Sequence, residues 1–181
     1  MNKQFSKLRV DVLPAIALAA TLSAPTSHAN DLNDAAIIAI YNQVNTMDIE
    51  TALLGQVKGY SADVRQLATM VSRDHSGVRK MAHELAEEIG VTPTLPAARA
   101  DAAKQHYEVI ARLRDQSQKG FDKAYLKHEI EFHRAAISAV KTILLPSAQH
   151  PALKNHFNQV LPHFEHHLNE TIRVAKKLNV Q

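Results

Sequence analysis

Apolar side chains recur every three or four positions along four long stretches of the chain, a spacing that places them on one face of an α-helix. The second stretch shows the pattern most clearly, at Val64, Leu67, Val71, Val78, Ala82, Leu85 and Ile89. The first stretch is less regular, because Ile38, Ile49 and Leu53 lie on another face than its main stripe. Four amphipathic helices predict an all-α fold in which the apolar stripes pack together as a four-helix bundle.

Capping residues, glycines and prolines predict where these helices begin and end. The first helix should follow Asn33 or Asp34 and end before Gly59, and Ser61 should cap the second. Gly120 should break the helical pattern after the connecting helix, and Asp122 should cap the third long helix. Pro162 should kink the fourth helix or split it in two. The expected helices cover residues 34–57, 62–89, 122–145 and 151 onward, with a shorter connecting helix at 97–116.

Each long helix carries one metal-capable side chain inside its apolar stripe: Asp48, His75, His133 and His167. A polar group on a buried face costs free energy unless it has a partner. All four positions lie near the middle of their helices, so we expect them at a similar depth in the bundle. They are therefore either polar core residues bonded to their surroundings, with Asp–His hydrogen-bond pairs among them, or ligands of one shared metal ion.

Two further carboxylates belong to the candidate site. Asp74 lies on the flank of His75, and Glu129 lies one helical turn before His133 on the same face. The chain has no cysteine, so a metal would be held by imidazole, carboxylate or water, a donor set that suits a transition metal such as Zn, Fe or Mn. No Glu-x-x-His motif occurs, which argues against a di-iron centre of the ferritin type. The pattern favours a single metal ion.

The other histidines are expected outside this site, with His83, His106, His128 and His166 facing solvent and His156 and His163 near a solvated edge of the last helix. No nucleotide-binding loop or catalytic triad is recognised, so we do not expect an enzyme; a hydrolase or oxidase would require a cleft beside the site.

The N-terminus indicates export. Residues 1–29 combine a basic start, a short apolar run and the small residues of a cleavage site, which predicts a signal peptide and a mature domain at 30–181. Removing three basic residues and one acidic residue with this segment leaves a nearly neutral chain, with no basic tract for nucleic acid. No later stretch is apolar enough for a transmembrane helix. We expect the protein in the periplasm, where it could associate with the outer membrane.

Several segments, in this order and spacing, resemble the DUF4142 family of exported bacterial proteins. They are Arg73-Asp74-His75, the Leu85–Gly90 segment with the Val-Thr-Pro-Thr-Leu-Pro that follows it, Gly120-Phe121-Asp122-Lys-Ala-Tyr125, His133, Leu161-Pro162 and His167-Leu168. The resemblance covers about residues 34–178 and implies a ferritin-like helical fold, often labelled a putative outer membrane protein. The family pattern has an Asp-His pair matching Asp74 and His75 and usually has Glu where this chain has Asp48.

Two functions remain open at this point. The first is a bundle that binds one metal ion for buffering, sensing or protection against stress. The second is a metal-free structural or interaction module of the cell envelope.

Overall fold

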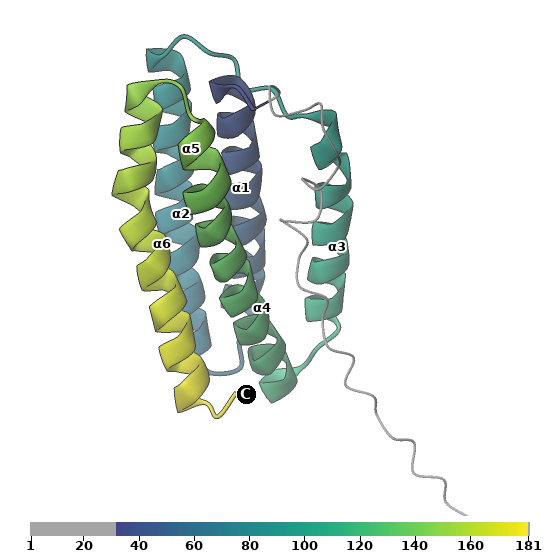
Figure 1. The fold of residues 1–181 in the computed structure, drawn as a ribbon. Coiled ribbons are helices and arrows are strands. Elements are labelled where there is room, and N and C mark those ends of the chain that lie inside the picture. Colours follow the sequence, from purple (N-terminus) through teal and green to yellow (C-terminus); the bar gives the residue numbers. More distant parts are fainter. Residues whose placement is uncertain (1–31, 181) are drawn as a thin grey trace, which may run out of the picture.

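The computed structural model describes residues 32–180, and the predicted all-α four-helix bundle with one shorter connecting helix is confirmed (Figure 1). The predicted signal peptide at 1–29 lies outside the described residues. The elements are α1 (Asp34–Lys58), α2 (Ala62–Glu88), the 3₁₀ turn η1 (Ala97–Arg99), α3 (Ala100–Arg114), α4 (Gln118–Ala139), the π-helical turn η2 (Val140–Leu144), α5 (Leu145–Ser147) and α6 (Pro151–Lys177).

The bundle consists of α1, α2, α4 and α6, while α3 stands beside it and packs against α1 and α4 (Figure 1). The short α1–α2 turn makes these two helices close neighbours, and α4 pairs with α6. Between residues 32 and 180, none of the helices is both long enough and apolar enough to cross a membrane.

Several predicted helix ends are confirmed. The Asn33 side chain accepts a hydrogen bond from the backbone N–H of Ala36, and Ser61 caps α2 in the same way. The second helix ends next to Gly90, whose φ of +71° is a conformation that glycine adopts without strain. Pro162 does not split the last helix, because α6 continues through it.

The expected start of the third long helix is wrong. The α4 helix begins at Gln118, so Gly120 lies inside its first turn and Asp122 is a helical residue. The buried Asp122 carboxylate instead accepts hydrogen bonds from the backbone N–H groups of Tyr60 and Ser61, both at 2.8 Å. It therefore satisfies the backbone of the α1–α2 turn and ties that turn to α4.

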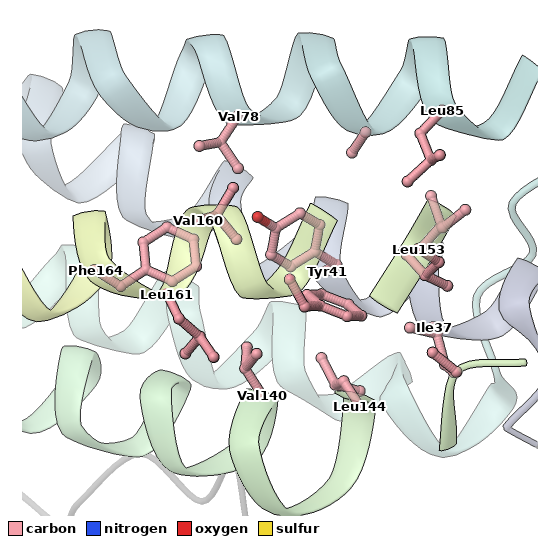
Figure 2. Close-up of a cluster of buried hydrophobic side chains, with 14 of the residues drawn as sticks. Ile37, Tyr41, Val78, Leu85, Val140, Leu144, Leu153, Val160, Leu161 and Phe164 are labelled. Carbon is pink, nitrogen blue, oxygen red and sulfur yellow. The ribbon is translucent and has the colours of Figure 1, made fainter. Parts of the chain in front are cut away.

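Two apolar clusters fill the bundle, one at each end. Figure 2 shows the first apolar cluster, where side chains of α1, α2, η2 and α6 point toward one another. It includes Ile37, Tyr41, Val78, Leu85, Val140, Leu144, Leu153, Val160, Leu161 and Phe164. The second apolar cluster comprises Ala52, Val64, Leu67, Ala68, Val71, Val109, Leu113, Phe121, Tyr125, Leu126, Val174 and Ala175. On each bundle helix the two clusters leave a gap in the middle.

Candidate metal centre

Five buried polar side chains occupy the gap between the two apolar clusters, and we call them the polar layer. They are Asp48 on α1, His75 on α2, Glu129 and His133 on α4, and His167 on α6. Each is at most 4 % exposed. The sequence placed these residues in the apolar stripes at mid-helix, and the fold brings the stripes to one depth. Phe164 of the first apolar cluster stacks on the His75 ring, 5.1 Å between centroids, and closes the layer on that side.

Each of the three imidazoles donates one ring N–H to an acceptor on its outer side. His75 Nδ1 lies 2.7 Å from Asn45 Oδ1, which must be the acceptor because the Asn45 amide nitrogen donates to the Tyr41 carbonyl. His133 Nδ1 donates to the Glu129 backbone carbonyl at 3.0 Å. His167 Nε2 donates to the Asp74 carboxylate at 3.1 Å. These bonds fix the tautomer of each neutral ring and leave the other nitrogen with a free lone pair.

The three remaining nitrogens come together with Asp48. One ligand atom of each of the three histidines lies within 4.8 Å of the others. His75 Nε2 is 3.2 Å from His167 Nδ1, and Asp48 Oδ2 is 2.9 Å from His75 Nε2 and 3.5 Å from His133 Nε2. Donors at about 2.0–2.1 Å from a tetrahedral metal ion are separated from one another by about 3.3 Å. The three separations of 2.9, 3.2 and 3.5 Å are therefore close to those between donors around one such ion.

A second group of possible ligands shares His133 with the first. Asp48, Glu129 and His133 each offer an atom within 4.8 Å of the others. Among residues 32–180, neither carboxylate has a hydrogen-bond partner for its oxygens, and neither does His133 Nε2. Although Asp48 lies close to His75, the pair does not have the angle of a hydrogen bond. Buried polar atoms are nearly always satisfied, and a bound cation or water is a partner that these atoms could share.

Burial favours the neutral form of two of the three imidazoles, His133 and His167. Burial, reinforced by repulsion from His75 and His133, lowers the pKa of His167 to about 4. Burial likewise lowers the pKa of His133. Burial alone would raise the pKa of Asp48, but the attraction of the surrounding histidines outweighs it and lowers this pKa. For Glu129, burial and the nearby charge of Asp48 both raise the pKa well above its usual value. Neutral imidazoles and one ionised carboxylate are the protonation states that bind a metal ion.

Asp74 occupies a different place from the other five candidate residues. Its side chain is 31 % exposed, and it contacts the outer nitrogen of His167 while also pairing with Arg73. We therefore assign Asp74 the role of orienting His167, as an acceptor behind the ring rather than as a ligand.

The sequence missed some polar residues of the core. Asn45, one helical turn before Asp48, is buried and orients His75, and its position on the same face of the helix was the available signal. His106, His128 and His156 were expected near solvent but are 4–7 % exposed. His106 is covered because α3 lies on α1, where the His106 ring pairs with Glu50 at 2.8 Å. The expectation that His83, His163 and His166 face solvent is confirmed.

Comparison with known proteins gives one result. The family model described as "Domain of unknown function (DUF4142)" matches residues 19–174, nearly the whole chain. Neither the comparison with curated proteins nor the comparison with solved structures gives a match.

Proposed function

The chain belongs to the DUF4142 family, a domain of unknown function, and we propose that it binds one transition-metal ion in the polar layer through His75, His133, His167 and Asp48. The observation that carries this proposal is the orientation of the rings. Each imidazole uses one nitrogen for an outer acceptor, and its other nitrogen belongs to a group of atoms spaced like the ligands of one ion. Histidine ligands in metalloproteins have this arrangement of an outer acceptor and an inner lone pair.

The contact between His75 and His167 favours a bound metal ion over a centre that holds no cation. With both rings neutral and their outer nitrogens protonated, His75 Nε2 and His167 Nδ1 face each other at 3.2 Å through two lone pairs. Two lone pairs repel, and a cation or a proton between them would remove that repulsion. A metal ion bound to both nitrogens turns this repulsion into two coordinate bonds.

The alternative is a metal-free centre in which a proton replaces the ion. His75 would then be an imidazolium that donates to Asn45 and His167, balanced by the negative charge of Asp48. This state satisfies the facing nitrogens and fits a structural or interaction module. It leaves His133 Nε2 without a hydrogen-bond partner among residues 32–180, whereas the metal satisfies that nitrogen as well. The proposal therefore favours the metal.

The donor set also suggests the class of ion and the role. Three imidazoles and one carboxylate suit Zn²⁺ or Fe²⁺, and also Mn²⁺ with lower affinity. Four protein donors around one ion make a closed site, which is typical of an ion that is held rather than one that performs catalysis. Together with the signal-like N-terminus, this supports a periplasmic protein that buffers or senses a metal, or protects the envelope by binding it.

Metal analysis of the purified protein tests the proposal. The protein is prepared without a metal-affinity column, stripped with a chelator, loaded with Zn²⁺ and freed of excess ion, and bound zinc is measured by mass spectrometry. We expect one ion per chain in the parent and its loss in His133→Gln. His156→Gln is the matched control, because His156 is also a buried histidine but lies on α6 outside the layer. If the parent retains no Zn²⁺, Fe²⁺ or Mn²⁺, the metal-free alternative replaces the proposal.

A further inference from the structure

One ion held by three histidines and Asp48 leaves part of the polar layer unexplained. It uses one oxygen of Asp48, while Asp48 Oδ1 and both carboxylate oxygens of Glu129 remain buried and without a hydrogen-bond partner in the described chain. Glu129 is 0 % exposed, so water outside the bundle does not solvate it. The hydroxyl of Tyr125, one turn before Glu129 on α4, is likewise buried and unsatisfied within residues 32–180.

The carboxylates of Asp48 and Glu129 both lie close to His133. Asp48 links the two groups of donors, because its Oδ2 lies 2.9 Å from His75 Nε2 and 3.5 Å from His133 Nε2, while its carboxylate belongs to the second group with Glu129 and His133. One oxygen of its carboxylate lies within 4.8 Å of an oxygen of Glu129. A carboxylate has two oxygens, so Asp48 can bind one cation through Oδ2, beside the imidazoles, and a second cation through the unpartnered Oδ1.

We propose that the polar layer has a second, oxygen-rich cation position between Asp48 and Glu129, beside the nitrogen-rich position, and that it takes a hard divalent ion such as Mn²⁺. This inference rests on the proposed function, since Asp48 serves both ions. The two positions differ in chemistry: imidazole nitrogens favour zinc, whereas carboxylate oxygens favour manganese or magnesium. Ionised carboxylates only accept hydrogen bonds, so a cation can satisfy their oxygens directly where the protein provides no donor.

The competing account keeps a proton on Glu129. A protonated Glu129 would donate to Asp48, satisfy part of the unpaired set and leave room for only one ion. Glu129→Gln distinguishes the two accounts, because the amide is neutral like the protonated acid and can still donate to Asp48. Under the competing account, this substitution leaves the number of bound ions unchanged.

The experiment counts Mn²⁺ on protein that already holds zinc. The parent is loaded with one Zn²⁺, and Mn²⁺ is then titrated while the free ion is followed by its electron paramagnetic resonance signal. We expect one tightly held Mn²⁺ per chain, lost in Glu129→Gln and kept in the matched control Glu50→Gln. The control removes another carboxylate, which pairs with His106 outside the layer.

The outcomes separate the two proposals. If no zinc is retained, the proposed function fails; if one zinc but no Mn²⁺ is retained, only the second position is overturned. If Glu129→Gln does not fold, the parent loaded with Mn²⁺ alone provides the test. Two ions joined by a carboxylate lie about 3.5–4 Å apart and should give a spin-coupled spectrum. An uncoupled spectrum overturns the second position.

Discussion

Removing the Asp74 carboxylate should weaken metal binding although Asp74 is not a ligand. Its Oδ2 accepts the Nε2–H of His167 at 3.1 Å, and this bond holds the ring with Nδ1 toward the centre. Burial tends to raise the pKa of Asp74, but the hydrogen bonds from Arg73 and His167 outweigh it and lower this pKa. The acceptor is therefore ionised at neutral pH, and its charge also makes the ring a better electron donor to a metal.

The size of the effect follows from the exposure of this carboxylate. Losing an acceptor behind a histidine ligand typically reduces metal affinity by about 10–100-fold. Because the Asp74 side chain is 31 % exposed, water can replace part of its hydrogen bonding in Asp74→Ala. We therefore expect the lower limit, about tenfold, which corresponds to about 1.4 kcal/mol of binding free energy.

Competition with a coloured zinc chelator measures this affinity at fixed pH and salt. Asp63→Ala is the matched control, because Asp63 is another partly exposed aspartate on α2 and pairs with Lys177 away from the layer. We expect weaker zinc binding in Asp74→Ala and unchanged binding in Asp63→Ala. Equal affinities of Asp74→Ala and the parent would refute the assignment of Asp74 as the residue that orients His167.

Three further predictions concern the stability of the bundle, measured by urea unfolding of chelator-treated protein. Gly77→Ala should stabilise the bundle by about 1 kcal/mol, because nothing lies within 4 Å of the added Cβ in the middle of α2. Gly55→Ala should destabilise it by about 1–3 kcal/mol, because the added Cβ would lie 2.8 Å from the Tyr125 ring. Stability changes of the same sign for both substitutions would contradict this packing. Asp122→Ala should cost about 2–4 kcal/mol by leaving two backbone N–H groups of the α1–α2 turn unpaired, and a loss below that of an ordinary surface substitution would disprove the role of this turn contact. Burial lowers the pKa of His128 to about 4, so between pH 6.5 and 4 the unfolded chain binds this proton and the folded chain does not, and stability falls as the pH falls. The free energy of unfolding of the parent minus that of His128→Gln should therefore fall by about 2–3 kcal/mol from pH 7.5 to 4.5. Glu129 contributes to stability with the opposite pH dependence, but it is present in both proteins and cancels in this comparison. A free-energy difference that does not change with pH would show that His128 is not buried in its neutral form.

The sequence predicted the bundle and named all the residues of the polar layer because both depend on helical periodicity. An apolar stripe must be buried, and a polar residue inside it is carried into the core at a depth fixed by its place along the helix. Asp48, His75, His133 and His167 needed no further information. Their convergence could not be read from the chain, since it depends on which helices pair and how they rotate against one another.

The errors arise where contacts between helices override local signals. Gly120 and Asp122 resemble a helix start, yet the Asp122 side chain has better partners in the α1–α2 turn. The buried His106 was missed because α3 covers a second face of α1. The apolar stripe of α1 is less regular because Ile38 is fully buried in the first apolar cluster, whereas Leu53 is half exposed.

The polar layer is difficult to explain as part of the folding core alone. The apolar clusters on either side already bury side chains from all four bundle helices. Polar and ionised groups in such a position are commonly replaced by apolar residues of similar size with no loss of stability, and often with a gain. A bundle selected only for stability would therefore carry apolar side chains at these five positions. Places where a chain departs from the rules that shape the rest of its fold are typically functional sites, and here the departure consists entirely of residues that can bind metal.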